Sequence, residues 1–355
     1  MDPADSLTMS YIIPYPAVKG IYRDRTFFVT DAGQTSAEHK QEFGICQGCP
    51  LSPFLFVIVM TVLISDARVL LSERAGEVDT EELLYADDTL LIDRAGGHVQ
   101  DYMECIHEIG AEYGLSFNWG KLEVLTVRCR DVIKTPDGSA VKNKASMVYL
   151  GSLLSEDGYT ELELSRRIGA ARADFDALRR LWSHANVPRE DKLRVFNACV
   201  MSKLMYALHT AWLNVAARRR LDGFQARCLR RIVGIEHSYL SRVSNAEVLK
   251  VSGAKSASST LLRSQLRLFG RVATCNAAAN LRKELFEPGC LDIKRLDGDR
   301  RQGRPRNYWP QMVRSHAVAA AGSECQLNRL LGPEPRRTKK NEWEEAVRRY
   351  IQRMQ

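Results

Sequence analysis

The strongest constraint on the fold is a pair of adjacent aspartates, Asp87 and Asp88, at the centre of the apolar segment that runs from Leu83 to Ile92. Two neighbouring charges are costly in such a segment unless a turn exposes them or a cation binds them. Two short strands joined at the doublet would hold both carboxylates on a rigid turn. Because carboxylate oxygens are hard ligands suited to Mg²⁺ or Mn²⁺, the pattern predicts either a metal-binding turn or an ordinary hairpin turn.

A motif upstream favours the metal-binding interpretation. The sequence Gln47-Gly48-Cys49-Pro50-Leu51-Ser52-Pro53 opens a long apolar run, and Tyr85-Ala86-Asp87-Asp88 follows that run. In this order the two motifs resemble those of the reverse transcriptases of non-LTR, LINE-type retrotransposons. The resemblance implies an RNA-directed DNA polymerase that uses two Mg²⁺ or Mn²⁺ ions, with Asp87 and Asp88 as catalytic metal ligands. The implied fold is α+β, a partial polymerase palm with helices on one face of an antiparallel sheet, followed by a helical thumb-like and carboxy-terminal region.

The same resemblance gives roles to residues outside the doublet. Gln47 and Gly48 would place the template-nucleotide pair, and Lys121 would approach the triphosphate as a catalytic residue. Tyr85 would stack beneath the primer end, and core packing explains a tyrosine at this position equally well. Tyr149 and Gly151 resemble the primer-gripping hairpin of the family. The charge pattern adds two candidate nucleic-acid contacts: Arg230 and Arg231 in a cation-rich helix, and Arg304 and Arg306 in a basic run beside two aromatic residues. The helix arginines could instead be solvated, and the basic run could instead be a nuclear import signal.

One part of the family pattern is missing from this sequence. In the family, an earlier palm strand carries another metal-binding aspartate, and no such motif precedes Gln47, where the acidic candidates do not follow apolar strands. The fingers of the polymerase would also lie upstream. We therefore expect an amino-terminally truncated enzyme that is inactive or weak alone, because two-metal transfer needs carboxylates from separate strands. A partner chain that completes the palm would restore the full set of metal-binding carboxylates. The acidic candidates are Asp2, Asp5, Asp24 and Asp31.

Periodicity and composition divide the chain into five segments. We expect a disordered lead-in over 1–16, the partial palm over 17–158, a helical thumb-like region over 159–252, a small and polar linker over 253–260, and a basic helical carboxy-terminal region over 261–355. In the second segment, the apolar run 51–64 is too short to span a bilayer. It predicts a buried helix with Ser52 as N-cap and Pro53 in the first helical position.

The thumb-like region carries clear helical stripes. Apolar residues recur at alternating spacings of four and three, as on the buried face of an amphipathic helix. The three predicted stripes are Leu164, Ile168, Ala171, Phe175, Leu178 and Trp182; Leu193, Phe196, Val200, Leu204 and Leu208; and Leu221, Phe224, Cys228 and Ile232, the last with Gly234 as its stop. A terminal helix with Trp343, Val347 and Ile351 closes the chain.

Charge and cysteine content limit the class of partner. Lysine and arginine total 51 against 43 acidic residues, and the net charge of +8 favours polyanions such as an RNA template, a DNA primer and deoxynucleotide triphosphates. The nine cysteines are scattered, and no secretory signal opens the sequence, so we expect free thiols and a nuclear or cytoplasmic protein with no membrane partner.

Two further interpretations stay open. The chain could be a non-catalytic RNA- or DNA-binding remnant of a retroelement, in which case binding persists without polymerisation and weakens as salt rises. It could also be a decayed element without a selected role. In that case an apolar face would be exposed where the missing fingers and palm strand should pack.

Overall fold

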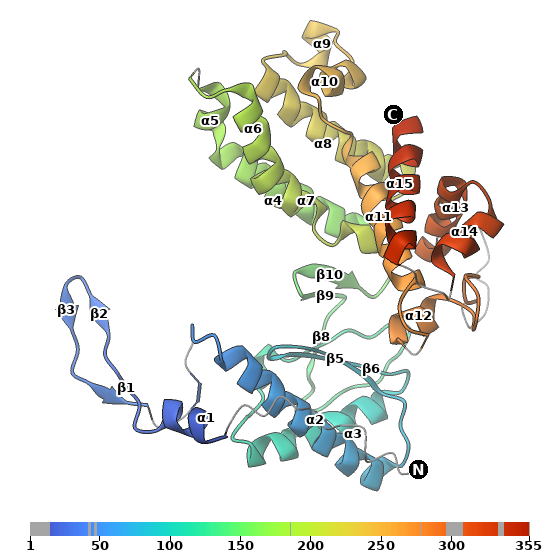
Figure 1. Cartoon of the computed structure of the whole chain (residues 1–355). Helices are drawn as coiled ribbons and strands as arrows, with labels where there is room; N and C mark the ends of the chain where they lie inside the picture. The colour runs from blue at the N-terminus through green and yellow to red at the C-terminus, as the bar shows by residue number, and fades with distance from the viewer. Residues whose placement is uncertain are drawn as a thin grey trace. The chain divides into compact units, whose positions relative to one another are not determined.

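The computed structural model describes residues 15–41, 44–45, 48–184, 186–277, 279–295, 308–332 and 337–354, without the side chains of 15–17 and 337–339. The chain forms two compact units (Figure 1), the first comprising 1–124 with 129–143 and the second comprising 125–128 with 144–355. Of the predicted disordered lead-in 1–16, residues 1–14 lie outside the described residues. The fold is α+β, as the sequence predicts.

The first unit combines helices with pairs of short strands. Its sheets are two-stranded, so the palm sheet expected from the sequence is represented by separate strand pairs rather than by one continuous sheet among the described residues. Its helices are α1 Tyr15–Tyr22, α2 Ser52–Ala75, α3 Gly96–Glu112 and the 3₁₀ turn η2 Trp119–Lys121. Its strand pairs are β1 Thr26–Phe27 with β4 His39–Lys40, β2 Thr30–Asp31 with β3 Gln34–Thr35, β5 Glu81–Tyr85 with β6 Asp88–Ile92, and, in parallel, β7 Glu123–Val124 with β8 Lys142–Asn143.

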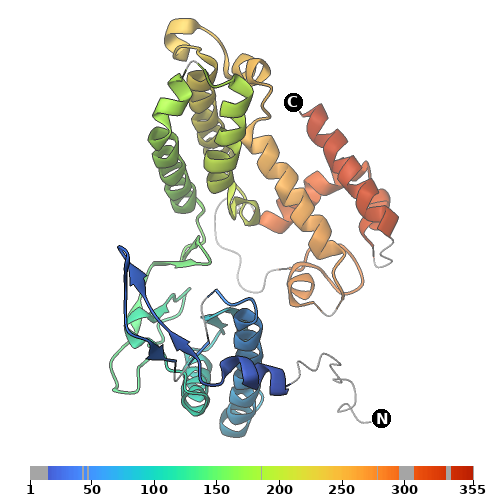
Figure 2. The same cartoon turned by 60° about the vertical axis from the view of Figure 1, so that its left-hand side comes forward.

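The core of this unit lies between α2 and α3, which run side by side in both views (Figure 2). Leu63, Ala67 and Leu71 of α2 pack against Tyr102 and Ile106 of α3, and Leu91 of β6 packs onto the same cluster. A second small cluster forms on the other side of α3 around Met103, Ile133 and Val141. The predicted strands on either side of the aspartate doublet are therefore confirmed, and one of them is anchored in the core.

Helix α2 differs from its sequence prediction in three ways. It extends over 24 residues instead of the predicted 14, and its N-cap is Leu51, so Ser52 is the first helical residue and Pro53 the second. Ser52 is buried and its hydroxyl lies 3.2 Å from that of Tyr22. The prediction of a buried helix is also wrong. The exposed apolar side chains are Phe54, Val57, Ile58, Val59, Val62 and Val69.

The exposed stripe on α2 has a simple origin. Among the described residues, the buried side chains of α2 belong to the face that meets α3, and the apolar side chains elsewhere on the helix stay exposed. Among the described helices, α2 is also the one long and apolar enough to cross a membrane by length and composition, a property that helices packed within proteins share. The stripe marks a surface that favours contact with another apolar segment.

The second unit begins with a hairpin and continues as helices. The hairpin pairs β9 Ser146–Tyr149 with β10 Ser152–Ser155. The first helices are α4 Glu161–Ala177, α5 Arg179–Ser183, α6 Arg189–Val195, a π-helical turn Phe196–Met201, α7 Ser202–Met205, the 3₁₀ turn η4 Leu208–Thr210 and α8 Val215–Val233. The later helices are α9 Ser238–Ser241, α10 Asn245–Ser252, α11 Ala257–Ala273, α12 Asn280–Leu285, α13 Trp309–Ala321, α14 Glu324–Leu331 and α15 Arg337–Arg353.

The helical stripes predicted from the sequence form the cores of this unit. The stripes on α4, on α6 to α7 and on α8 share one cluster, in which Leu164, Leu204 and Leu221 are completely buried. Gly234 ends α8 with φ at +75°, the left-handed conformation that glycine adopts without strain. A second cluster joins α11 to α13, α14 and α15, and includes Trp343, the predicted anchor of the terminal helix.

The segment 253–260 is a short, ordered connection, not the flexible linker that its composition suggests. Gly253 ends α10, and α11 begins at Ala257. The Ser256 hydroxyl caps α11 by accepting from the Ser259 N–H at 3.2 Å. The buried amide of Gln225 donates to the Lys255 carbonyl at 2.8 Å and accepts from the Ala257 N–H at 2.7 Å. Small polar residues therefore serve as caps here, a use that composition alone cannot separate from that of a spacer.

Candidate functional site

The aspartate doublet lies at the tip of the β5–β6 hairpin. Tyr85 pairs with Asp88, which leaves Ala86 and Asp87 as a two-residue turn. Ala86 adopts φ of +54°, a conformation that costs a residue with a Cβ about 1 kcal/mol and that two-residue hairpins require. Asp87 and Asp88 are both exposed. The structure therefore places both carboxylates in solvent on a tight, strained turn.

The two faces of this hairpin differ in what covers them. Leu91 packs into the α2–α3 core, and its cross-strand neighbour Glu82 binds Arg68 of α2 at 2.5 Å. The opposite face carries Tyr85 directly across from Asp88, because paired residues point to the same side. Tyr85 is 64% exposed, so the core-packing alternative for this side chain is wrong in the described structure. Tyr85 and Asp88 thus share an open face with Asp87 at its tip.

A divalent cation would find only part of its ligand set here. In the residues that the structure describes, no three His, Cys, Asp or Glu side chains come together as a metal site. Two of the other acidic residues of this unit are engaged elsewhere, since Asp24 lies 3.7 Å from Lys40 and Asp66 accepts from Tyr113 at 2.6 Å. The carboxylates of Asp87 and Asp88 fit one side of a metal centre chemically, and further ligands must come from outside the described residues, from water or from substrate.

The remaining predicted residues of the first unit are spread over two loops. Gly48 has φ of +86° in the turn before α2, which explains the preference for glycine there, while Gln47 lies outside the described residues. Lys121 ends the η2 turn, and its backbone N–H donates to the Asn118 carbonyl at 2.9 Å. Its side chain is exposed.

Tyr149 and Gly151 belong to the β9–β10 hairpin of the second unit. Leu150 and Gly151 form its turn, both with positive φ. The Gly151 carbonyl accepts from Arg166 at 2.6 Å and from Arg167. A Cβ on residue 151 would meet the ring of Tyr206 at 3.5 Å, in ordinary contact, so the positive φ rather than crowding favours glycine. Tyr149 is half-buried on β9. The turn is therefore fixed by contacts with α4 and α7.

The contact between this turn and α4 is organised by Glu163. Its carboxylate is buried and binds Arg166 at 2.7 Å and Arg167 at 2.6 Å. Burial disfavours the charged carboxylate, but the hydrogen bonds and charges of the two arginines outweigh that effect and lower the pKa of Glu163. The carboxylate holds both guanidinium groups in place over the turn.

The two arginines predicted together on α8 have different roles. Arg230 is only 4% exposed, and its guanidinium donates to the Val243 carbonyl at 2.6 Å, the Asn245 side chain at 3.1 Å and the Glu236 carbonyl at 3.2 Å. The prediction that Arg230 contacts nucleic acid is therefore wrong for this structure, because the side chain closes the loop that follows its own helix. Arg231 is exposed.

Arg231 belongs to a row of exposed cations where α4 and α8 lie side by side. Arg220 donates to Ser165 at 3.0 Å, and Arg231 lies 4.0 Å from Asp176. In each pair the two residues are 55 positions apart, so the helices run parallel in a fixed register. The same register sets Arg227 opposite Arg172, and both are exposed. We call these four cations, Arg172, Arg220, Arg227 and Arg231, the arginine row. Arg304 and Arg306 lie outside the described residues.

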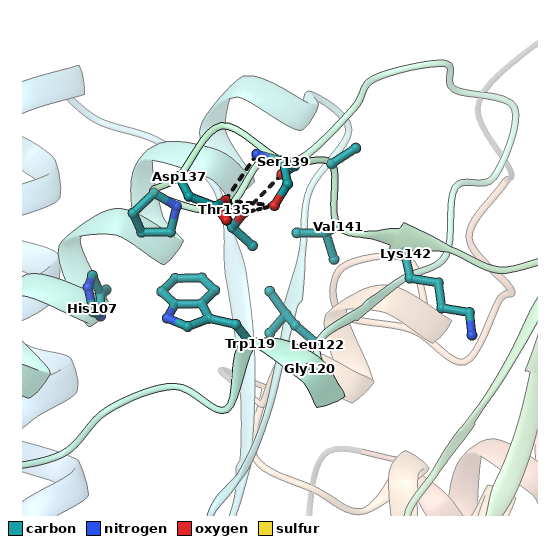
Figure 3. A pocket seen from close by; sticks show the side chains of 11 residues that line it. His107, Trp119, Gly120, Leu122, Thr135, Asp137, Ser139, Val141 and Lys142 are labelled. Atoms are coloured by element: carbon teal, nitrogen blue, oxygen red, sulfur yellow. Dashed lines mark hydrogen bonds between the residues drawn. The ribbon is translucent and has the colours of Figure 1, made fainter.

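The first unit also forms a pocket that no sequence pattern indicated. It lies between α3, the η2 turn and the loop 135–142, and its lining includes His107 and Trp119 (Figure 3). Phe117 and Trp119 follow α3 after a short segment, and Trp119 lines the pocket, but their sequence pattern is the same as that of ordinary core residues.

Comparison with known proteins gives a family match for the first part of the chain. Residues 5–154 match the family described as reverse transcriptase (RNA-dependent DNA polymerase), and this range contains the hairpin with Asp87 and Asp88. This part of the chain is therefore similar to reverse transcriptases. The matched reverse transcriptase segment also contains Lys121, Tyr149 and Gly151, whereas the arginine row lies beyond it.

A transposon-derived protein of Caenorhabditis elegans is also similar to this chain. The two are 27% identical over 158 residues, which cover 43% of this chain and 56% of the relative. The match thus spans little more than half the length of that relative.

Proposed function

We propose that this chain is the reverse transcriptase part of a LINE-type retroelement, and that it acts in RNA-directed DNA synthesis. The observation that carries the proposal is the β5–β6 hairpin, which exposes Asp87 and Asp88 beside Tyr85 on an open face, within residues that match the reverse transcriptase family. The similarity to a transposon-derived protein supports a retroelement origin.

Each residue of the site has its own proposed role in metal, primer or nucleotide binding. Asp87 and Asp88 would hold Mg²⁺ or Mn²⁺, which when bound activates the primer hydroxyl and neutralises the departing pyrophosphate. Tyr85, 64% exposed beside them, offers a ring face to the primer end. Lys121 supplies a cation to the triphosphate, and Gln47 with Gly48 positions the template-nucleotide pair.

We also propose that these residues need a further carboxylate from another segment or a partner chain. Two adjacent aspartates on one turn point to different sides and cannot by themselves bridge two ions about 3.5–4 Å apart. The two-stranded β5–β6 sheet leaves an outer edge on each strand among the described residues, and the exposed stripe of α2 belongs to the same unit. A palm strand that carries an acidic side chain could pair with such an edge and so add the missing carboxylate to the sheet.

Primer extension tests the catalytic proposal. The purified chain would be assayed on an RNA template with a DNA primer and Mg²⁺ or Mn²⁺, alongside Asp87→Asn, Asp88→Asn and the control Asp79→Asn, an exposed aspartate outside the turn. We expect little or no extension by the chain alone. Supplying the completing segment should restore extension to the chain and to Asp79→Asn, and not to the two turn variants. Strong extension by the chain alone would overturn the need for a partner, and extension that survives both turn substitutions would overturn the site.

A second candidate function, nucleic-acid binding without catalysis, rests on the arginine row. Arg172 and Arg227 face each other as like charges in the α4–α8 register, an arrangement that an anion between them would stabilise. The row runs along one side of two parallel helices, which suits successive phosphates of a strand.

Salt titration of binding tests this candidate. Replacing Arg220, Arg227 and Arg231 with glutamine should weaken RNA binding and reduce the slope of log K against log salt by about one for each phosphate that no longer meets a cation. The matched control replaces Arg329, Arg349 and Arg353, which are exposed on α14 and α15. If all extension assays fail while the Arg220, Arg227 and Arg231 variant alone loses binding, the chain is a binding remnant. Equal effects of the two triple variants would show that only net charge matters.

A further inference from the structure

The pocket of the first unit has the size and lining of a ligand site that the polymerase assignment does not use. Its volume is about 580 Å³, within the range of small-molecule sites. His107 of α3 and Trp119 of η2 form one side, and Leu122 and Val141 contribute apolar surface. Figure 3 shows the Trp119 ring between His107 and Lys142. Apolar, aromatic and polar groups therefore meet in one concave space with one cation, Lys142, and one carboxylate, Asp137.

The loop opposite the aromatic side is rigidly held. Asp137 Oδ1 accepts from the Ser139 N–H at 3.0 Å, from its hydroxyl at 2.6 Å and from the Thr135 hydroxyl. The Val141 N–H donates to the Ile133 carbonyl at 2.8 Å, and both side chains are buried against α3. The Ser139 and Thr135 hydrogen bonds lower the pKa of Asp137 to about 2, so this carboxylate is charged at neutral pH. A preformed wall of this kind costs little entropy when a ligand binds.

The aromatic side is also preorganised. The ring of Trp119 meets that of His107 edge-on with centroids 5.0 Å apart, and that of Phe117 edge-on at 5.3 Å. These contacts fix the plane of the indole while leaving Trp119 half-buried and part of the pocket lining. A fixed and partly open indole face is the platform on which a planar ring stacks.

The His107 side chain lines the pocket through its ring. Its Nδ1 atom is buried and forms no hydrogen bond in the described structure, so the ring contributes surface to the pocket and this nitrogen is shielded from it. Lys142 is exposed at the rim and lies across the pocket from His107 (Figure 3).

We propose that this pocket binds one unstacked base of a single-stranded nucleic acid. The base lies against Trp119, and the adjoining phosphate meets Lys142 at the rim. A space of this volume admits one nucleotide. The net charge of +8 favours a polyanionic strand over an aromatic side chain of a peptide. The inference goes beyond the proposed function, because none of these residues belongs to its catalytic or nucleic-acid-binding set.

Photocrosslinking of the full chain tests the pocket directly. The probe is a short single-stranded RNA with one 4-thiouridine, irradiated in complex with the chain and mapped by mass spectrometry. We expect the labelled peptide to contain Trp119 or residues 135–142. Crosslinks that map only outside the pocket would overturn the proposal. This measurement needs no substitution and therefore does not depend on how a variant folds.

Binding measurements on variants provide the second test. Trp119→Ala should weaken binding of the single strand about tenfold or more, and Trp119→Phe should weaken it less, because a phenyl ring retains part of the stacking. The control Val132→Ala changes an exposed residue of the same loop that does not line the pocket, and should bind normally. Circular dichroism establishes that each variant is folded. Unchanged binding by folded Trp119→Phe and Trp119→Ala would overturn the proposal.

The same experiment separates this proposal from the polymerase assignment. Asp79→Asn, an exposed residue outside both the pocket lining and the aspartate turn, should bind the strand as the unaltered chain does. A duplex of the same sequence should show no loss of affinity on Trp119→Ala, because its bases are stacked and paired. Loss of affinity for the duplex on Trp119→Ala would contradict base binding by the pocket.

Discussion

The hydroxyl of Tyr206 donates a hydrogen bond of 2.9 Å to the backbone carbonyl of Leu150 and so ties the β9–β10 turn to the end of α7. The guanidinium of Arg167 lies 4.7 Å above the same ring. The reverse transcriptase match ends at residue 154, so the last part of the family segment is built into the second unit.

Removing the hydroxyl should loosen this hairpin. Tyr206→Phe is expected to lower the free energy of unfolding by about 1 kcal/mol and to speed amide exchange in β9 and β10, because the ring stays while the bond is lost. Urea denaturation and hydrogen exchange measure the two effects. Tyr239→Phe, in an exposed tyrosine of α9, is the control. Equal exchange in the two variants would contradict the assigned contact.

The Glu163 cluster should make the same hairpin sensitive to acid. Because its pKa in the folded chain lies below the ordinary value of 4.5, Glu163 contributes stability above that pH, and the contribution is lost as pH falls through the folded pKa. The stability difference between the unaltered chain and Glu163→Gln should therefore shrink from about pH 7 to about pH 3. Denaturation at several pH values measures it, with the exposed Glu156→Gln as control. A constant difference would show that Glu163 is not stabilised as the charged form.

Neighbouring arginines on α8 should respond in opposite ways. Arg230→Met is expected to destabilise the chain by about 3 kcal/mol, because carbonyls of the loop after α8 lose a buried charged donor. Arg231→Gln should change stability by less than about 0.5 kcal/mol and weaken nucleic-acid binding. Urea denaturation and a binding titration on both variants distinguish them. Similar stabilities would contradict the structural role of Arg230.

The connection between α10 and α11 depends on one amide. Gln225→Ala should cost about 2–4 kcal/mol, because it leaves the Lys255 carbonyl and the Ala257 N–H without their partner in a buried position. The control is Asn328→Ala on α14. Denaturation measures the difference, and a cost no larger than that of the control would show that residues 253–260 do not rely on Gln225.

The exposed stripe of α2 should limit solubility. Replacing Phe54 and Val57 with glutamine is expected to reduce self-association and binding of a hydrophobic dye with little loss of stability, because both side chains are mostly in solvent. Leu63→Gln, in the buried face of the same helix, should instead unfold the unit. Sedimentation and dye fluorescence measure the outcome. Destabilisation by the first pair would show that the stripe is covered.

Local patterns predicted the helices with apolar stripes and the β5–β6 hairpin, because periodicity and turn chemistry act over a few residues. The stripe from Leu164 to Phe175 and the stop at Gly234 are examples. The turn at Asp87 was predictable on the same ground, since two charges between apolar strands favour a hairpin tip. The separate roles of Arg230 and Arg231 could not be predicted, because one position turns a side chain by about 100° around the helix and decides whether it faces a loop or solvent.

Features that depend on distant segments could not be predicted from local patterns. Whether Phe54 is buried depends on what covers α2, and apolar composition carries no information about that cover. The pocket at Trp119 exists only because the loop 135–142 folds back toward α3, a contact between segments far apart in sequence.

The π-helical turn at Phe196–Met201 has a consequence for how this chain can change in length. Such a turn spaces its hydrogen bonds one residue further apart than an α-helix does, so α6 and α7 are joined through one surplus residue. Deleting a single exposed position there, such as Cys199, would convert the turn to regular α-helix and keep Phe196 and Leu204 on their original sides. Relatives with one residue fewer at this place would therefore be compatible with the same bundle.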